Sequence, residues 1–418
     1  MQPSMAADPG VEAVIRTALD RLAGDLPALG IALSGGGDSV ALMHVIAGWA
    51  GGRRIMAATV DHRLRPDSTA EAEAAGRAAT ALGITHTILH WGHDRAGDTD
   101  SGNLMAQARD ARLRLLSAWA QANELPAIAL GHTRDDQAET VVMRMLRGSG
   151  VDGMAGMAEW RDAFGVRWLR PMLGVGRDAL RDWLRARDIG WVDDPSNNNA
   201  DFDRIRIRRA LTELDVDRSA LAMVASNLTE VRATLAHYAA EVSFDATADR
   251  GRLTLPRGPF RRAPAEIQRR ILIAAARWVS GADYPPRRAT ALHAVRALDA
   301  NSRVTLDGAL ISPDGDRLQV TREPAAALRA PPSPGPVWDN RWRIDGLEPG
   351  QTITALGEEA LADQSWRLSG LPRDDAIASP AIRQEGRLIA APLIRATPGI
   401  TCLPLRGIEE FRRLIRHG

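Results

Sequence analysis

The 418-residue sequence contains no lysine, so all 53 of its basic residues are arginine. Without a lysine the chain cannot form a Schiff base through its own side chains, and it cannot supply the lysine that reaches the phosphates in a Walker loop. Cysteine is scarce as well, because Cys402 is the single one. That excludes an internal disulfide and a metal cage built from cysteines. We expect Cys402 to be a small buried apolar residue.

Long apolar runs and an excess of one charge are also missing. No run reaches the roughly 18 residues of a membrane span, and residues 1–8 lack the charged-then-apolar pattern of a signal peptide. We therefore expect a cytoplasmic protein without membrane contact. The net charge is +1, so any contact with nucleic acid must come from local patches. An apolar content of 45% suits two or three globular domains.

The chain is organised around residues 30–44, where a short apolar stretch runs into three glycines at 35–37 and then into an apolar helix. Glycines let backbone N–H groups surround an anion, and the positive end of the helix dipole points at the same place. Ser34 and Ser39 add hydroxyl donors. The Asp38 carboxylate would repel a phosphate unless a divalent cation lay between them. This stretch predicts a nucleotide phosphate site with Mg²⁺ at Asp38, and a simple glycine-rich turn is the alternative.

Strands and helices alternate along the first half of the chain. Strands are predicted at 30–33, 54–60, 84–90 and 127–130, and helices at 11–24, 68–82, 103–123 and after 131. This alternation is typical of an α/β fold with a doubly wound parallel sheet, in which ligands bind at the carboxyl ends of the strands. Three polar groups follow strand ends, so we expect them to converge on one cleft: the 34–39 loop, Asp61 with His62, and His132 with Asp135, Asp136 and Glu139.

The last of these groups places four ionisable side chains within eight residues. Such a cluster costs stability unless something cationic is bound, and a metal, an arginine partner or an amine substrate would each meet that need. The glycine loop and Asp38 favour Mg-ATP over a zinc site. For Asp61 and His62, a capped helix start is the alternative to a functional role.

Arginine recurs at every second position from Arg204 to Arg208, on one face of a strand or over most of a helix surface. This pattern suits phosphate contacts, and a solvated basic helix start is the alternative. The glycine-rich stretch 148–157 is too long for a simple turn, so we expect it to be functional. Further along, arginines on predicted helices favour an RNA-facing surface about as strongly as a solvated one.

Composition divides the chain into four parts. Helices are predicted at 217–242, 264–280 and 286–298, followed by strands near 303–306, 309–312 and 317–321. A proline-rich stretch then reads as a stiff linker, and short strands follow it. We expect a catalytic domain at 1–212, a helix-rich domain at 213–328, a linker at 329–337 and a small β-rich C-terminal domain at 338–418.

The 34–39 loop resembles the pyrophosphate-binding loop of the ATP pyrophosphatases, which cleave ATP between its α and β phosphates. A series of motifs over residues 28–210 resembles, in order, one family among them, the tRNA(Ile)-lysidine synthases. The motifs are Ser34 to Ser39, Val60 to Arg65, Ala108 to Arg112, Gly131-His132 with Asp136 to Thr140, Arg147 to Gly150, Gly153 with Gly156-Met157, Arg170-Pro171, and Trp191 with Asp194 to Asn197. Arg63, Leu113 and Ile205 depart from the family pattern, Arg63 standing where a glycine is usual.

The resemblance implies an ATP- and Mg²⁺-dependent ligase that joins free L-lysine to the wobble cytidine of tRNA(Ile) with a CAU anticodon. It implies tRNA contacts by the helix-rich domain and tRNA recognition by the C-terminal one. The residues implied are Asp38, His132 and Asp136 for catalysis, Ala32, Ser34, Gly35, Gly36, Gly37, Asp38, Ser39, Val60 and His62 for ATP, Asp38 for the metal, and Arg112, Asp136, Glu139, Arg170, Arg204 and Arg208 for the substrates.

Three other functions are weaker alternatives. A tRNA thiolase needs paired cysteines, and this chain has one. An amide-forming ATP pyrophosphatase that makes a small metabolite would release AMP without RNA. A nucleotide-binding regulatory module would bind ATP without turnover, which the presence of Asp38, His132 and Asp136 disfavours. The oligomeric state, monomer or homodimer, stays open.

Overall fold

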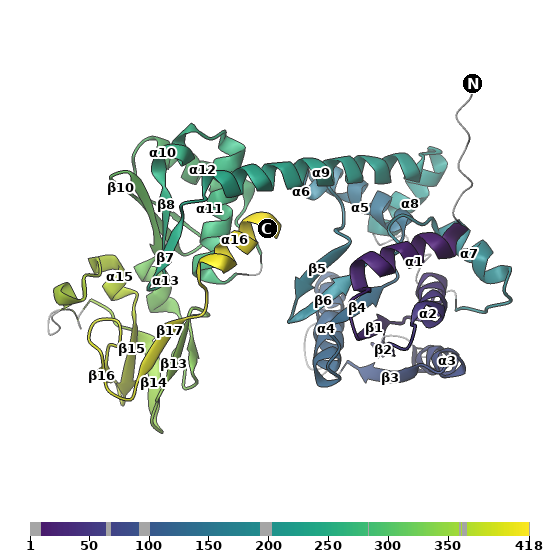
Figure 1. Ribbon diagram of the computed structural model, residues 1–418, viewed down its shortest axis with the longest axis horizontal. Helices are drawn as coiled ribbons and strands as arrows, with labels where there is room; N and C mark the ends of the chain where they lie inside the picture. Colours follow the sequence, from purple (N-terminus) through teal and green to yellow (C-terminus); the bar gives the residue numbers. More distant parts are fainter. Residues whose placement is uncertain are drawn as a thin grey trace. The chain divides into compact units, whose positions relative to one another are not determined.

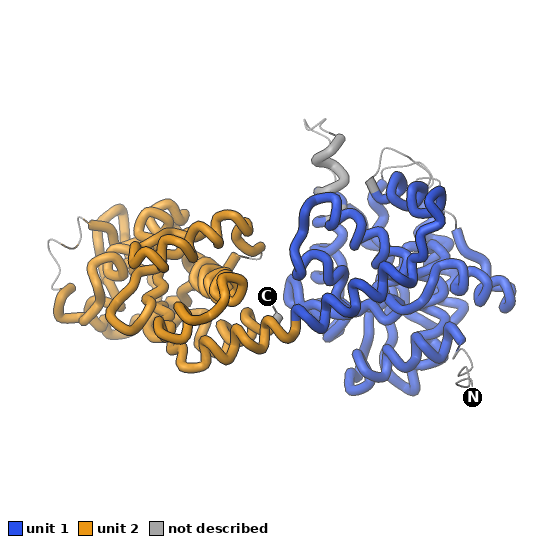
Figure 2. Tube along the Cα trace, turned by 90° about the horizontal axis from the view of Figure 1, so that it is seen from above, with its two compact units in different colours: residues 1–232 blue, residues 233–418 orange. Residues whose placement is uncertain are grey.

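The computed structural model describes residues 10–63, 68–91, 101–192, 203–282, 284–358, 361 and 366–417. Its internal contacts divide the chain into two compact units, residues 1–232 and 233–418 (Figure 2). The division falls inside one continuous helix, α9 (Arg218–Val242). The domain bounds at 212, 328 and 337 stay predictions. In the described part of the chain, no helix is long and apolar enough to cross a membrane.

The first unit contains a six-stranded sheet in the order β3-β2-β1-β4-β6-β5 (Figure 1). Its strands are β1 (Ala28–Ala32), β2 (Arg54–Asp61), β3 (Thr85–His90), β4 (Ala127–Leu130), β5 (Trp160–Ala163) and β6 (Val166–Leu169). Neighbouring strands are parallel except for β5 with β6. The strand order reverses between β1 and β4, the point at which doubly wound sheets bind ligands. The predicted α/β class is confirmed; β5 is missing from the prediction because its polar residues form no apolar run.

Helices cover both faces of this sheet. The helices that precede α9 in this unit are α1 (Gly10–Ala23), α2 (Gly37–Trp49), α3 (Ser68–Ala81), α4 (Ser101–Ala122), α5 (Arg134–Leu146), α6 (Val151–Met154), α7 (Arg177–Arg185) and α8 (Asp203–Glu213), of which α6 and α8 pack against α5. Because side chains alternate along a strand, Leu29 and Ile31 pack with α1, α2, α3 and α7, whereas Ala28 and Ala32 pack with α4. A Cβ at Gly30 would lie 2.9 Å from the Trp119 ring, so glycine lets α4 approach the sheet closely.

The second unit is built on a five-stranded antiparallel sheet in the order β7-β8-β11-β10-β9. These strands are β7 (Thr247–Asp249), β8 (Arg252–Pro256), β9 (Val304–Leu306), β10 (Ala309–Asp314) and β11 (Arg317–Arg322), and the helices that pack with them are α10 (Arg257–Arg262), α11 (Ala265–Ser280), α12 (Arg288–Asp299) and α16 (Ile408–His417). The predicted strands at 303–321 are confirmed, whereas β7 and β8 are additional. Phe411 of α16 is fully buried, so the end of the chain completes this core.

Two three-stranded sheets, β12-β13-β17 and β14-β15-β16, lie in the last hundred residues. Their elements are α13 (Pro324–Arg329), β12 (Val337–Trp338), β13 (Trp342–Asp345), β14 (Gln351–Ala355), the 3₁₀ turn η2 (Trp366–Ser369), α15 (Arg373–Ile377), β15 (Pro380–Gln384), β16 (Arg387–Ala390) and β17 (Thr401–Pro404). Trp338 and Trp342 fill their core, and half-buried Cys402 packs beside them. Within the predicted linker, the Ser333 and Ile353 backbones exchange hydrogen bonds of 3.0 and 2.8 Å.

Candidate active site

The glycine loop after β1 is closed by its two serine hydroxyls. The Ser34 N–H donates to Ser39 Oγ (3.1 Å), and Ser39 Oγ donates to the Gly36 carbonyl (2.9 Å). The two hydroxyl oxygens lie 3.0 Å apart and are hydrogen-bonded to each other. Gly35 has a φ of +83°, which glycine adopts without strain. Helix α2 begins at Gly37, and the first N–H groups of a helix have no intrahelical partner, so they can bind an anion.

Residues 191 and 192 lie against this loop. The Val192 N–H donates to the Gly35 carbonyl at 3.0 Å. A Cβ at Gly37 would lie 3.4 Å from Trp191 Cδ1, so the missing side chain leaves room for the indole. The next part of the predicted motif, Asp194 to Asn197, lies outside the described residues, as do Leu64 and Arg65 of the motif that follows β2.

The end of β4 touches the first turn of α2. A Cβ at Gly131 would lie 3.1 Å from both the Cα and the N of Ser39, so a larger residue here would crowd the backbone of α2. His132 follows, and its Nδ1 accepts a hydrogen bond from Arg170 Nε at 3.2 Å. Burial lowers the pKa of His132 to about 3, with nearby arginine charges adding to the effect and Asp136 opposing it. His132 is therefore neutral and carries its proton on Nε2, where it can donate a hydrogen bond.

Arg177, the first residue of α7, joins the carboxylates of α2 and α5. Its Nε donates to Asp38 Oδ2 (3.1 Å), its Nη2 donates to Asp136 Oδ1 (3.1 Å), and its Nη1 lies 3.6 Å from Glu139 Oε1. Its backbone N–H donates to Asp135 Oδ2 at 2.8 Å. Arg177 is not among the site residues predicted from the sequence. The available signal was the acidic cluster itself, for which an arginine partner was one of the three cations considered.

The three carboxylates differ in how far the chain satisfies them. Asp136 Oδ2 accepts from the N–H and the hydroxyl of Thr133, both at 2.8 Å, and so completes the capping box of α5. Burial alone would raise the pKa of Asp136, but Arg177 and these bonds lower it. Glu139 Oε1 accepts from Arg208 Nε at 2.7 Å, whereas its buried Oε2 has no hydrogen-bond partner among the described residues. Burial raises the pKa of Asp38 despite the attraction of Arg177.

The predicted arginines lie around the two histidines of the site. Arg112 from α4 and Arg204 from α8 act electrostatically on His132, and Arg112 also acts on His62. His62 Nδ1 is buried without a partner in the described part of the chain, and its ring meets Trp91 edge-on at 5.8 Å. Burial lowers the pKa of His62. The alternating arginines belong to helix α8, which brings Arg204 close to His132 and Arg208 to Glu139.

Asp61, at the end of β2, is only 2% exposed, and nearby residues of the same chain supply its hydrogen bonds. It accepts from the Arg63 N–H (2.9 Å), Ser68 Oγ (2.8 Å) and Thr69 Oγ1 (2.8 Å), which fixes the start of α3. The capped helix start, given as the alternative, is met only in part, because Asp61 bonds the hydroxyls of Ser68 and Thr69 at the start of α3. Arg63 has a φ of 50°, a left-handed conformation that glycine adopts at lower cost, which accounts for the glycine usual at this position.

Comparison with known proteins decides the family. Residues 12–214 match the family model of the PP-loop domain. The chain is 43% identical over 393 residues to the tRNA(Ile)-lysidine synthase of Ruegeria pomeroyi, and the match covers 92% of each chain. The chain belongs to the tRNA(Ile)-lysidine synthase family. Members of this family are ligases with a PP-loop domain, and that domain implies the use of ATP.

Two further proteins show the range of similarity. The tRNA(Ile)-lysidine synthase of Bradyrhizobium diazoefficiens is 36% identical over 337 residues, covering 72% of this chain and 91% of that protein. Among solved structures, the U34-tRNA thiolase NcsA from Methanococcus maripaludis is similar over 53% of this chain and 79% of its own, with 16% identity and a TM-score of 0.46.

The possible ligands in the acidic site of this lysidine synthase family member show which kind of metal ion it suits. Among the described residues, no three His, Cys, Asp or Glu side chains gather as ligands for one ion. Mg²⁺ does not need such a cage, because it is commonly held by one or two carboxylates together with phosphate oxygens and water. Asp38 fits that role: its side chain is 24% exposed beside the anion-binding turn, and burial makes a cation partner favourable.

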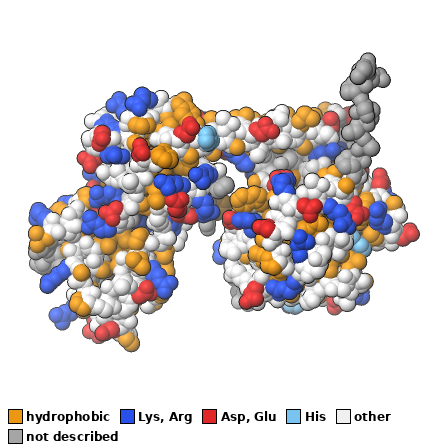
Figure 3. Space-filling view, viewed as in Figure 1, with side chains coloured by type: hydrophobic (Ala, Val, Ile, Leu, Met, Phe, Trp, Pro, Cys, Tyr) orange, Lys and Arg blue, Asp and Glu red, His pale blue; other side chains and the backbone are white. Residues whose placement is uncertain are grey.

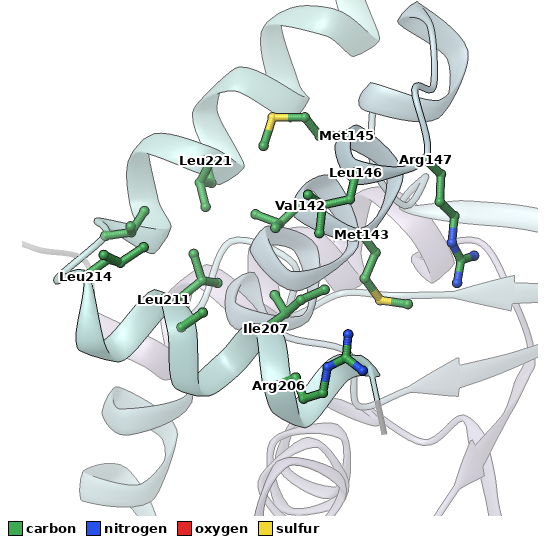
Figure 4. A pocket seen from close by; sticks show the side chains of 12 residues that line it. Val142, Met143, Met145, Leu146, Arg147, Arg206, Ile207, Leu211, Leu214 and Leu221 are labelled. Atoms are coloured by element: carbon green, nitrogen blue, oxygen red, sulfur yellow. The ribbon is translucent and has the colours of Figure 1, made fainter. Parts of the chain in front are cut away.

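An apolar groove of about 670 Å³ lies elsewhere in the first unit, between α5, α8 and the start of α9 (Figure 4). Its walls include Met145, Leu146, Leu211 and Leu214, and Arg206 lies at its edge. None of the site residues predicted from the lysidine synthase resemblance lines it. The groove and the candidate active site are therefore different places, and the polar contacts described above identify the active site.

Arginine is also spread over the surface outside this site. Figure 3 shows basic and acidic side chains interspersed over both units on the face that it presents. In the second unit Arg261, Arg262 and Arg287 are exposed, whereas Arg269 is buried and paired with Glu266 at 2.6 Å. Only part of the predicted basic surface can therefore face a partner, and RNA contact by this lysidine synthase family member stays a prediction.

Proposed function

We propose that this chain joins free L-lysine to C2 of the wobble cytidine of tRNA(Ile) with a CAU anticodon, in the cytoplasm. In the first step the C2 oxygen of the cytidine bonds to the α-phosphorus of ATP and pyrophosphate leaves. In the second step the amine of lysine bonds to C2, loses a proton, and AMP leaves with the former C2 oxygen. The products are lysidine, AMP and pyrophosphate, and the tRNA changes from a methionine to an isoleucine codon identity.

The nucleotide would be held at the carboxyl ends of β1 and β2. The Ser34–Ser39 turn offers backbone N–H groups to the pyrophosphate, with the positive end of α2 behind them. Ala32 and Val60 would line the adenine pocket, with His62 beside it. Mg²⁺ on Asp38 would neutralise charge that develops on the leaving pyrophosphate.

His132 would contact the α-phosphate, because β4 ends against the same turn of α2. As a neutral donor through Nε2 it stabilises negative charge without giving up its proton, a role that preorganised hydrogen bonds commonly fill in phosphoryl transfer. Arg170 bonds the other ring nitrogen, so it acts as a positioning residue for His132. This contact supports a role for Arg170 in addition to the predicted substrate contact.

The amine of lysine would approach Asp136 and Glu139. Both oxygens of Asp136 are already engaged, and its lowered pKa makes it a weak base. Glu139 keeps one buried oxygen without a partner in the described residues, which favours Glu139 as the acceptor for the ammonium. Arg112, Arg204 and Arg208 would contact the cytidine or the anticodon backbone. The cytidine must leave its stack to reach the site, and this cost is small for a base in an exposed loop.

The observation that carries this proposal is the contact between Gly131 and Ser39, which puts the phosphate turn and His132 side by side in a chain of this family. The test is release of AMP and pyrophosphate from ATP with and without lysine and unmodified tRNA(Ile), while labelled lysine is followed into RNA. Label that requires both this tRNA and ATP supports the proposal. AMP release at the full rate without RNA would replace it with a small-molecule ligase.

A further inference from the structure

All three nitrogens of the Arg177 guanidinium face carboxylates. Nε and Nη2 each donate to an aspartate at 3.1 Å, and Nη1 lies 3.6 Å from Glu139. The side chain is only 12% exposed. Its backbone is held as well, because the N–H donates to Asp135 Oδ2 at 2.8 Å. Arg177 is therefore fixed at the place where the acidic groups of α2 and α5 meet.

The carboxylates around Arg177 are the ones to which external cations are assigned. Asp38 is the group that fits Mg²⁺, and Glu139 is the one that offers an oxygen to an ammonium. A guanidinium and a second cation on the same carboxylate repel each other, and the repulsion is strong in a partly buried site because water screens it poorly. An external cation must therefore weaken or replace a bond of Arg177.

We propose that Arg177 is the resident counter-ion of this site, and that its positive charge sets the affinity of the site for external cations. It competes with a divalent cation for Asp38 and with an ammonium for Glu139. In this role Arg177 is a positioning residue: it keeps the carboxylates charge-balanced and in place until a ligand arrives. The inference rests on the proposed function for the identity of the cations, but the competition at Asp38 can be measured without any turnover.

The test uses Mn²⁺ as a probe for the divalent cation, bound to the full chain without nucleotide and followed by electron paramagnetic resonance of free Mn²⁺. We expect Arg177→Gln to lower the Kd for Mn²⁺ about tenfold, because it removes a charge from the immediate surroundings of Asp38. Arg177→Lys, which keeps the charge, should stay within about twofold of the unmodified protein. The gain should vanish in the double variant Asp38→Asn with Arg177→Gln.

A matched control separates this local effect from the change in net charge. Arg252 is also a partly buried arginine, with Nη2 at 2.5 Å from Asp375 in the second unit. Arg252→Gln makes the same charge change and should leave Mn²⁺ binding unaltered. Equal binding by Arg177→Gln and Arg252→Gln, or a gain that survives Asp38→Asn, overturns the inference.

Folding has to be checked because Arg177 is bonded so extensively. Far-UV circular dichroism and thermal unfolding serve for this, and if Arg177→Gln does not fold, Arg177→Met, which removes the charge but keeps a long side chain, takes its place. Tighter Mn²⁺ binding is expected there too, and unchanged binding overturns the inference. Lysine incorporation into tRNA is measured separately: its absence beside tightened Mn²⁺ binding rejects the proposed function alone, and normal incorporation beside unchanged Mn²⁺ binding rejects the role of Arg177 alone.

Discussion

Asp38 and Asp61 follow neighbouring parallel strands, but their surroundings shift their pKa values in opposite directions. Asp61 accepts three hydrogen bonds from its own chain, which overcome the effect of burial and lower its pKa. The Asp38 carboxylate accepts a hydrogen bond from Arg177, but burial raises its pKa in spite of that partner. A strand end in this sheet can thus hold a carboxylate that the chain satisfies or one that it leaves in need of a cation.

The difference separates a structural group from a functional one. Asp61 secures the turn from β2 into α3, and a ligand would have to break three bonds to use it. Asp38 lies in the first turn of α2, where unpaired N–H groups favour an anion, and can accept a second cation. The family resemblance assigns Asp38 to the metal, and this contrast in surroundings supports the assignment.

The largest effect is expected from Asp38→Asn, which removes the functional one of the two carboxylates. Loss of the carboxylate that holds Mg²⁺ should lower tRNA-dependent AMP release by about 1,000-fold, or about 4 kcal/mol in the barrier. The thermal midpoint should change little, since Asn can still accept the Arg177 bond. Steady-state assay with a thermal unfolding control checks both statements, and a variant with more than a tenth of the activity would remove Asp38 from the metal site.

Asp61→Ala tests the other side of the comparison. Three donors lose the acceptor that they share, but Arg63 and Thr69 are exposed and can bond to water instead, so we expect the free energy of unfolding in urea to fall by roughly 2 kcal/mol. Activity per folded molecule should be retained. Unaltered stability together with lost activity would reverse the roles assigned to the two aspartates.

The same variant predicts a change in acid sensitivity. Because the folded pKa of Asp61 is lowered, its stabilisation is fully present above the unfolded value of about 4 and is lost as the pH falls through the folded pKa. The gap in stability between the unmodified protein and Asp61→Ala should therefore narrow below about pH 4. A gap that stays constant from pH 7 to pH 3 would contradict the charged state assumed for Asp61.

His132→Gln extends the comparison to the polar side chain that follows β4. Loss of one positioned donor should cost about 100-fold in AMP release, or about 2.7 kcal/mol. Because its pKa is about 3, His132 does not titrate between pH 5 and 9, so the variant should keep the shape of the pH profile in that range. A titration near pH 6 to 7 that disappears in the variant would show that His132 transfers a proton.

The smallest effect is expected from Gly35→Ala. At a φ of +83° an alanine is strained by about 1 kcal/mol, which should weaken ATP binding several-fold as the turn distorts. Gly190→Ala is the matched control, because nothing lies within 4 Å of its added Cβ and its φ is not positive. Isothermal titration with a non-hydrolysable ATP analogue measures both, and equal affinities would remove Gly35 from the phosphate site.

The phosphate turn could be predicted because its determinants are contiguous in the sequence: an apolar strand, followed by six residues that contain three glycines and two serines. The parallel sheet followed from the spacing of apolar runs. Arg177 could not be predicted, because its bonds to Asp38 and Asp136 span 139 and 41 residues. No local pattern distinguishes it from the other arginines. The alternating arginines on α8 show a different limit. Their spacing of two residues suits one face of a strand as well as a helix surface, and only the packing of α8 against α5 distinguishes the two.

The position of Trp191 beside Gly37 gives the protein a built-in optical probe. The indole lies where a side chain on Gly37 would touch it, beside the turn where a pyrophosphate would sit, and the adjoining residue is hydrogen-bonded to Gly35. A multiply charged group arriving there alters the local electric field, to which indole emission is sensitive. The difference in fluorescence between the unmodified chain and Trp191→Phe would then follow occupancy of the turn in real time, with neither RNA nor a radioactive label.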